Sequence, residues 1–192
     1  IAKAFNSDRI GLIIFSSEAF MQCPLTLDQS ALNLFIETLS SRLVPSTGTN
    51  FGPPLKMALQ KLNSEESTVI EQKSKVIILI SDGEDFGDET SSIISDIDNQ
   101  NIKLFTLGVG SEDGSKIKTN SGFKTDKYGE EVITQLNSKA LKNIAVSTGG
   151  KYFEINEKQN EVSKLINTIS SIEGELRDAR RIDVSANKYF YF

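Results

Sequence analysis

The chain contains no histidine and a single cysteine, Cys23, among its 192 residues. Ser/His/Asp and Cys/His catalytic triads and zinc sites built on imidazole all need the missing residue type, so the sequence excludes them. The metal chemistry that remains is that of oxygen ligands, which suit Mg²⁺, Ca²⁺ or Mn²⁺. One cysteine cannot form an internal disulfide, so cysteine usage does not indicate a redox compartment.

Long apolar runs and clusters of basic residues are also missing. No stretch reaches the roughly 18 consecutive apolar residues of a membrane-spanning helix. The net charge is −5, and phosphate binding draws on clustered Lys and Arg, so nucleic acid is not an expected partner. A length of 192 residues with 38% hydrophobic and 24% charged content suits one folded domain with a sizeable core.

Apolar runs alternate with helical patterns along the chain. The runs at 10–15 and 75–80 predict strands buried on both faces. The strands in this alternation are predicted at 10–15, 75–80, 102–110 and 151–154. The predicted helices are 29–39, 52–62, 90–99, 138–147 and 161–172, with N-caps at Asp28 and at Asn137 or Ser138. This alternation implies βαβ crossovers and a three-layer, doubly wound α/β fold with a mainly parallel sheet.

Two stretches interrupt the alternation. Residues 19–25 are short and mixed and contain Pro24, which predicts an edge strand. Residues 111–135 are rich in Gly, Ser, Thr, Asp and Lys, and their 122–124 and 131–133 portions predict a hairpin excursion. The excursion is therefore the most distinctive surface that the sequence predicts.

Two short polar segments fall where open α/β sheets bind ligands, outside the carboxyl ends of the strands. Asp82 directly follows the predicted strand 75–80, and Thr49 precedes the helix that begins near Gly52. Each segment alone also fits a simpler role, a turn at Asp82 and a helix cap at Thr49. Together they predict a shared cation site, with the Thr49 hydroxyl and an Asp82 carboxylate oxygen about 4 to 6 Å apart.

Other motifs give weaker indications. Gly108-Val109-Gly110 follows a strand, but Asp113 stands where a dinucleotide fingerprint needs its third glycine. The acidic run 82–89 does not have the spacing of an EF-hand, so its surplus acids indicate a solvated loop or the outer shell of a metal site. Ser16 and Ser17 have no base to activate them and indicate a polar strand end. An enzyme that uses Asp82 would need a base or phosphate-binding loop that the sequence does not show.

Five short motifs occur in an order that resembles a von Willebrand factor type A domain and, more narrowly, the bacterial Bat aerotolerance proteins. They are residues 23–28 (CPLTLD), 47–50 (TGTN), 81–85 (SDGED), 106–110 (TLGVG) and 147–153 (STGGKYF). The resemblance covers roughly residues 7–173. It implies a metal-ion-dependent adhesion site in which Thr49 and Asp82 supply oxygens to Mg²⁺. Water or the carboxylate of a partner protein would take the last metal position.

The sequence departs from this family pattern at its start. The family's first metal motif, Asp-x-Ser-x-Ser, follows the first, central strand, and neither is found in these residues. If that strand lies upstream of Ile1, strands 10–15 and 75–80 are expected to be present but unpaired, about 9 to 10 Å apart. A strand from another chain would fit such a gap, so a homo-oligomer is a further expectation.

The C-terminal segment has a different composition from the rest. It carries Arg177, Arg180 and Arg181 and ends in the four aromatics 189–192. Aromatics after basic residues are typical of the interfacial start of a membrane helix, so 1–173 is predicted to be the domain and 174–192 a juxtamembrane tail. The Bat resemblance implies a bacterial inner-membrane protein with its domain on the periplasmic side.

The sequence therefore predicts a non-enzymatic, membrane-anchored type A domain that binds a protein partner through a Mg²⁺ site. The alternative is a structural scaffold with a vestigial metal site that makes its contacts through residues 111–135.

Overall fold

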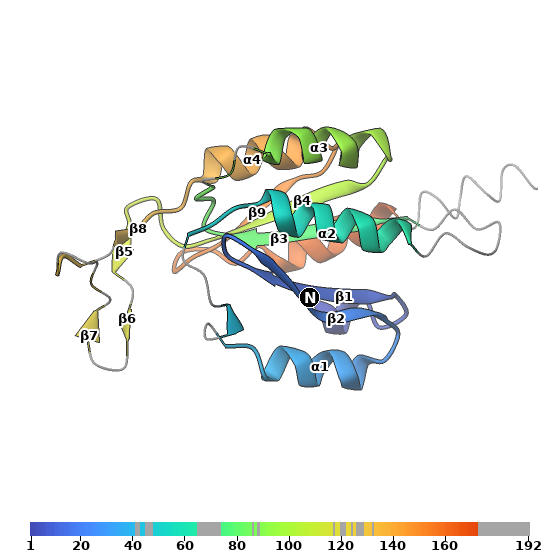
Figure 1. Ribbon diagram of the computed structural model, residues 1–192, viewed down its shortest axis with the longest axis horizontal. Helices are drawn as coiled ribbons and strands as arrows, with labels where there is room; N and C mark the ends of the chain where they lie inside the picture. The colour runs from blue at the N-terminus through green and yellow to red at the C-terminus, as the bar shows by residue number, and fades with distance from the viewer. Residues whose placement is uncertain are drawn as a thin grey trace, which may run out of the picture.

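The computed structural model describes residues 1–40, 43–44, 48–64, 74–85, 87, 89–116, 118–119, 122–123, 125, 129–131 and 133–172. Its main sheet contains three parallel strands in the order β3–β4–β9. These are β3 (Val76–Ser81), β4 (Lys103–Val109) and β9 (Tyr152–Ile155). An antiparallel pair, β1 (Ile10–Phe15) and β2 (Ala19–Thr26), forms a second sheet beside it (Figure 1).

Helices lie on both sides of these sheets. Three helices share one core with β3 and β4: α2 (Gly52–Asn63), α3 (Thr90–Asn99) and α4 (Ser138–Val146), of which α3 and α4 lie at the top of Figure 1. On the opposite side α1 (Gln29–Glu37) packs under β1 and β2, and the helix at 162–172 packs against β4 and β9. The predicted three-layer α/β fold with a mainly parallel sheet is therefore confirmed.

Neighbouring residues of the central strands point into two different cores, because side chains alternate along a strand. Leu104 on β4 joins the core beneath α2, α3 and α4, together with Leu79 of β3. The next residue, Phe105, joins the second core with Phe153 and the 162–172 helix, where Leu165 is fully buried. Burial on both faces explains the largely apolar sequence of β4, whereas the prediction that 75–80 is buried on both faces is wrong, since in β3 only Ile77 and Leu79 are buried and Ile80 is 50% exposed.

Local capping fixes where two helices begin. The Asp28 carboxylate accepts hydrogen bonds from the backbone N–H groups of Ser30 and Ala31, at 2.9 and 3.0 Å. The Asn137 side chain accepts one from the N–H of Ala140 at 3.1 Å. Both predicted N-caps satisfy backbone donors that the first helical turn leaves without partners.

As predicted, the strands at 10–15 and 75–80 are both present and do not pair with each other, while the predicted separation of about 9 to 10 Å stays a prediction. In the described part of the chain β1 pairs only with β2, and β3 pairs only with β4. The other edge of β3 is therefore the outer edge of the three-stranded sheet. The prediction that residues 10–15 are buried on both faces is wrong, because no residue of β1 is fully buried. The physical reason is that in the described part of the chain β1 has a strand along one edge, β2, and residues of β1 line a cavity.

The excursion is more divided than the sequence predicted. Strand β5 (Ser115–Lys116) pairs with β8 (Ile133–Thr134), and β6 (Lys118–Thr119) pairs with β7 (Gly122–Phe123). The expected pairing of 122–124 with 131–133 is therefore wrong in detail, since 122–123 pair with the strand just before them. An isolated bridge between Thr125 and Glu131 is the link nearest to the predicted hairpin. The tail at 174–192 lies outside the described residues.

Candidate functional site

Asp82 directly follows β3, and hydrogen bonds from several described residues position it. Its backbone carbonyl accepts a 2.7 Å hydrogen bond from the N–H of Asn137. Its carboxylate Oδ1 accepts from the Ser81 hydroxyl and the Glu84 N–H, each at 3.3 Å, and Oδ2 accepts from the Thr134 hydroxyl at 2.9 Å. The half-buried carboxylate is therefore held in one orientation at the carboxyl end of the sheet.

Gly83 allows the chain to leave β3 sharply after Asp82. Its φ is +86°, a conformation that side chains with a Cβ disfavour. A Cβ at this position would also lie 2.6 Å from the carbonyl oxygen of Asn137. The close approach is what lets the start of α4 pack against the loop and hold the Asp82 backbone. Glycine is therefore required here for both conformation and space.

The Thr49 segment is tied to the same end of the sheet by two hydrogen bonds from its backbone N–H groups, and a third forms within the segment. The N–H of Asn50 donates to the carbonyl of Ser16, just after β1, at 2.9 Å. The N–H of Phe51 donates to the Asp85 carboxylate at 3.1 Å, and the N–H of Gly52 donates to the Asn50 side chain at 2.9 Å. Asp85 and Asn50 thus cap the first turn of α2, whose positive N-terminus favours the Asp85 charge.

Asp85 is a functional residue that the sequence reasoning missed. The acidic run was expected to be a solvated loop or an outer shell, but the Asp85 carboxylate binds two backbone N–H groups, those of Phe51 and Gly87. It joins the loop after β3 to the loop before α2. No local signal distinguishes Asp85 from its acidic neighbours, because its main partner is 34 positions away in the chain.

The structure therefore places the loops that carry Thr49 and Asp82 side by side. Thr49 is half-buried, and its hydroxyl makes no hydrogen bond with the described residues, so its oxygen is available. The distance between the Thr49 hydroxyl and the Asp82 carboxylate stays a prediction. These two oxygens fit a hard cation in type. The described residues contain no cluster of three or more Asp, Glu, His or Cys that could hold a metal ion, so two oxygens would leave most of its positions to other ligands.

The excursion begins and ends at this site. Thr134 on β8 donates to Asp82, as described above, and the N–H of Leu136 donates to the carbonyl of Ser111 at 3.0 Å. Glu112 accepts a hydrogen bond from the Ser138 hydroxyl at the start of α4. The excursion thus projects from the edge of the candidate metal site (Figure 1). The sequence indicates the excursion and the Thr49–Asp82 site separately, and the contact between them is seen only in the structure.

Two other titratable groups, the Cys23 thiol and the Tyr152 hydroxyl, have raised pKa values. Burial, followed by the nearby charge of Asp28, raises the pKa of the Cys23 thiol, which is 1% exposed. Burial, followed by the 2.8 Å hydrogen bond to Glu154, raises the pKa of the Tyr152 hydroxyl. Both groups therefore stay protonated at neutral pH, which suits structural roles.

Most of the chain matches the model of a known family. The family model described as von Willebrand factor type A domain matches residues 1–168. The chain belongs to this family. Domains of this family are generally protein-interaction modules without enzymatic activity, and they commonly carry a divalent-cation site.

Solved structures with this fold include two from Bacteroides. The conserved hypothetical protein BatB of Bacteroides thetaiotaomicron is 24% identical, with a TM-score of 0.79 over 92% of this chain and 83% of that one. An aerotolerance-related membrane protein of Bacteroides fragilis is 26% identical, with a TM-score of 0.74 over 87% of this chain and 83% of that one. The type A domain described here is therefore similar to Bat proteins.

A curated relative extends beyond the matched region. An uncharacterized protein of Borreliella burgdorferi is 24% identical over 156 residues, which are 79% of this chain and 43% of that protein. The chain thus spans less than half the length of this relative. Among the described residues no helix is long and apolar enough to cross a membrane.

Proposed function

We propose that this type A domain binds a protein partner through a divalent cation held by the Asp82 carboxylate and the Thr49 hydroxyl. The observation that carries the proposal is the hydrogen bond from the Phe51 N–H to Asp85, which fixes the two loops against each other. This bond joins the loop before α2 to the loop after β3 at the carboxyl ends of the strands, where ligands of α/β sheets bind, and so supports a site shared by the two loops.

The cation would act as a bridge. Two protein oxygens leave several coordination positions of Mg²⁺ to water or to other ligands, and Mg²⁺ commonly keeps water in such sites. An acidic side chain of the partner could replace one of those waters. Mg²⁺ is our choice because both donors are hard oxygens. A mussel byssus protein of this fold, 19% identical, has zinc in its MIDAS motif, so the test includes both metals.

We place the domain in a Bat-like protein of the bacterial inner membrane, with the domain on the periplasmic side. The Bacteroides fragilis relative is described as an aerotolerance-related membrane protein, which supports this placement. The basic and aromatic composition of 174–192 supports a juxtamembrane role for that segment.

The experiment is calorimetric titration of the full-length protein with Mg²⁺ and, separately, with Zn²⁺. Asp82→Asn and Thr49→Val each remove one oxygen ligand, and we expect each to weaken Mg²⁺ binding by about tenfold or more. Thr49→Ser keeps the hydroxyl and should bind normally. Asp96→Asn is the matched charge control, because Asp96 is exposed on α3, away from the strand ends.

Partner capture from a membrane extract, with Mg²⁺ and then with a chelator, tests the second half of the proposal. The Asp82→Asn variant should lose the chelator-sensitive partner, whereas Asp96→Asn should retain it. Equal Mg²⁺ affinity in Asp82→Asn and the unmodified protein would refute the assignment of the site.

A scaffold role is the second candidate, and one observation favours it. Both oxygens of the Asp82 carboxylate already accept hydrogen bonds from protein groups, so the residue also has a structural task. In that case contacts would be made through the excursion, where Phe123 and Ile133 are exposed. Partner binding that survives the chelator and Asp82→Asn would support the scaffold.

A further inference from the structure

One short segment of the chain, residues 134–137, holds Asp82 at two points. The N–H of Asn137 donates to the Asp82 backbone carbonyl at 2.7 Å, and the Thr134 hydroxyl donates to the carboxylate Oδ2 at 2.9 Å. Asn137 caps α4, which is anchored in the core by the fully buried Leu141. Thr134 belongs to β8, in the last part of the excursion. The body of the domain therefore fixes the backbone of Asp82, whereas the excursion fixes its carboxylate.

The bond from Thr134 is the shortest that this carboxylate makes with the described residues. Its length of 2.9 Å lies within the usual range for an O–H donor. The contacts to Oδ1 from Ser81 and Glu84 are both 3.3 Å and lie beyond the usual ranges for O–H and N–H donors. Ser81 and Glu84 are also close neighbours of Asp82 in the chain. Thr134, 52 positions away, is therefore the contact that orients the carboxylate relative to the rest of the domain.

A hydroxyl donor suits this task beside a cation. It carries no charge, so it does not repel a divalent ion as a lysine or arginine would. Because Thr134 bonds to Oδ2, the long contacts are confined to Oδ1, and Oδ1 is the oxygen that loses least by turning to a cation. Hydrogen bonds that orient a ligating carboxylate typically change metal affinity by about 10- to 100-fold.

Small contacts close the base of the excursion, which we define as β5, β8 and Leu136. The ladder of β5 with β8 contains two residues from each strand, and the N–H of Leu136 donates to the carbonyl of Ser111 at 3.0 Å. Ile133 on β8 is 59% exposed, so this ladder lies at the surface. Segments with few buried apolar contacts open locally at a low free-energy cost. The hydrogen bond from Thr134 to Asp82 therefore contributes measurably to holding the base in place.

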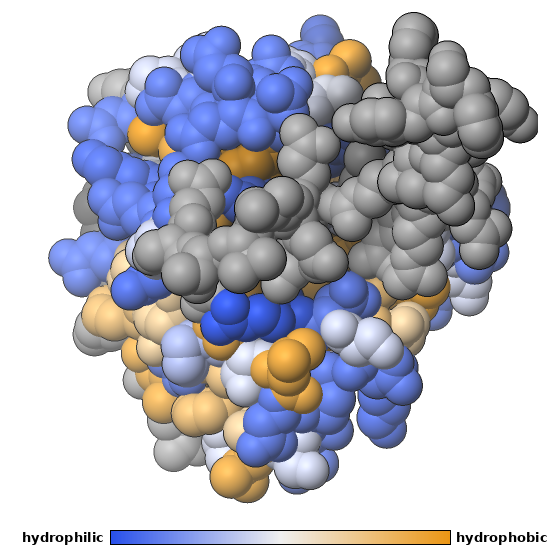
Figure 2. Space-filling view, turned by 90° about the vertical axis from the view of Figure 1, so that its right-hand side faces the viewer, coloured by the Kyte–Doolittle hydropathy of each residue, from blue (hydrophilic) through white to orange (hydrophobic). Residues whose placement is uncertain are grey.

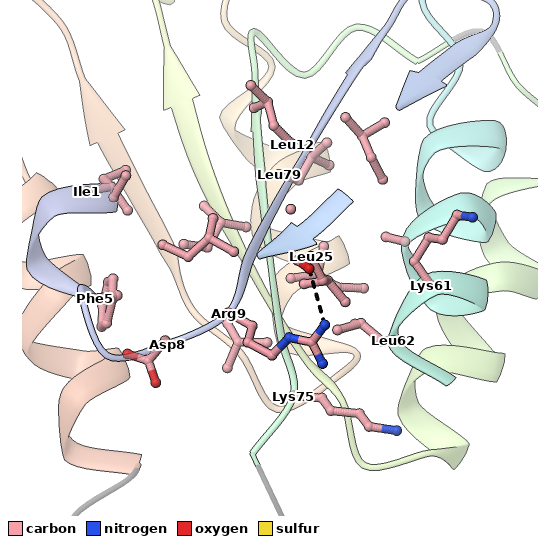
Figure 3. Close-up of a pocket in the computed structure, with 18 of the residues that line it drawn as sticks. Ile1, Phe5, Asp8, Arg9, Leu12, Leu25, Lys61, Leu62, Lys75 and Leu79 are labelled. Atoms are coloured by element: carbon pink, nitrogen blue, oxygen red, sulfur yellow. Dashed lines mark hydrogen bonds between the residues drawn. The ribbon is translucent and has the colours of Figure 1, made fainter. Parts of the chain in front are cut away.

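Exposed apolar side chains do not by themselves single out the excursion. It projects from one end of the domain (Figure 1), and the opposite end, which faces the viewer in Figure 2, also shows apolar residues among hydrophilic ones. Residues of β1 and β3, among them Leu12 and Leu79, line an apolar cavity elsewhere in the fold (Figure 3). What distinguishes the excursion is that its base bonds directly to a candidate cation ligand.

We propose that Thr134 is a positioning residue for the cation site and couples that site to the excursion. Its hydroxyl holds the Asp82 carboxylate in the orientation that binds the cation, and the same hydrogen bond transmits cation binding to β8. This inference rests on the proposed cation site and adds its regulation. Because coupling between two sites is reciprocal, a partner that binds the excursion raises the affinity for the cation, and the cation raises the affinity for that partner.

The experiment is calorimetric titration of the full-length protein with Mg²⁺. Thr134→Val removes the hydroxyl donor and keeps the shape of the side chain, and we expect it to bind Mg²⁺ about tenfold more weakly. Thr134→Ser keeps the donor and should restore most of the affinity. Thr125→Val is the matched control, because it makes the same change in the same excursion at an exposed residue that is not among the described donors to Asp82. It should bind Mg²⁺ normally.

Hydrogen exchange with mass spectrometry measures the coupling without any partner protein. In the unmodified protein Mg²⁺ should slow exchange of the amides at 133–136, and in Thr134→Val this protection should be lost. With a chelator present, exchange at 133–136 should be faster in Thr134→Val and in Asp82→Ala than in the unmodified protein, because each variant removes one end of the same hydrogen bond. Exchange in α1 is the internal reference and should not change.

The outcomes separate this inference from the proposed function. Weaker Mg²⁺ binding in Asp82→Asn, together with unchanged binding in Thr134→Val, would refute the role of Thr134 and leave the cation site standing. Equal weakening in Thr134→Ser and Thr134→Val would show that the hydroxyl is not responsible. Equal protection of 133–136 by Mg²⁺ in Thr134→Val and the unmodified protein would refute the coupling. Absence of Mg²⁺ binding in the unmodified protein would refute both proposals.

Discussion

Replacement of Gly83 by alanine tests the construction of the cation site most directly. Gly83 has φ +86°, and an added Cβ would lie 2.6 Å from the carbonyl oxygen of Asn137 and 3.1 Å from a Leu141 side-chain carbon. The left-handed conformation costs an L-residue about 1–2 kcal/mol. Forcing a methyl group against packed backbone costs a further 1–3 kcal/mol or so. We therefore expect Gly83→Ala to lower the free energy of unfolding by about 2–5 kcal/mol.

Gly149 separates the two contributions to that loss. It also has a positive φ, +67°, but a Cβ there would meet nothing within 4 Å. Gly149→Ala should therefore lose only the conformational part, about 1–2 kcal/mol. Urea denaturation followed by circular dichroism measures both variants under the same conditions. The difference between them isolates the contact with Asn137.

The same variant has a functional consequence. The Asn137 N–H holds the carbonyl of Asp82, so displacing Asn137 should move the carboxylate that we assign to the cation. Gly83→Ala should bind Mg²⁺ more weakly than Gly149→Ala at a temperature where both are folded. Equal losses of stability in the two variants would refute the close approach at Gly83, and equal Mg²⁺ affinities would refute its role in positioning Asp82.

Two further changes test other parts of the fold. Thr148→Val should lower the free energy of unfolding, measured in urea, by about 1–3 kcal/mol, because it leaves the buried N–H of Leu104 without its 3.0 Å acceptor. Thr148→Ser keeps a hydroxyl and should lose less stability, and equal losses in the two variants would contradict this reasoning. Since the folded pKa of Tyr152 lies above its unfolded value of about 10, the stability it contributes is complete below that pH and falls as pH rises further. The urea midpoint should therefore fall more between about pH 8 and about pH 11 in the unmodified protein than in Tyr152→Phe. An equal fall in both proteins would show that the burial of this hydroxyl does not affect stability.

Local sequence patterns determined most of the elements. Predicted strand 10–15 and predicted helix 90–99 match β1 and α3 residue for residue, and Asp28 and Asn137 cap the helices as expected. These features depend on side-chain alternation, helical spacing and hydrogen bonds within three residues, all of which a sequence displays directly. The family motifs then allowed the lack of pairing between β1 and β3 to be predicted.

The site and the cavity were decided by contacts between distant residues. Asp85 meets Phe51 across 34 positions, and Thr134 meets Asp82 across 52, so neither partner could be chosen from the sequence. The burial of β1 was overestimated for the same reason: its apolar run indicates a strand with neighbours on both edges, but only the tertiary structure shows which neighbours are present. Periodicity specifies which face of an element is apolar, whereas the packing of distant elements decides what that face meets.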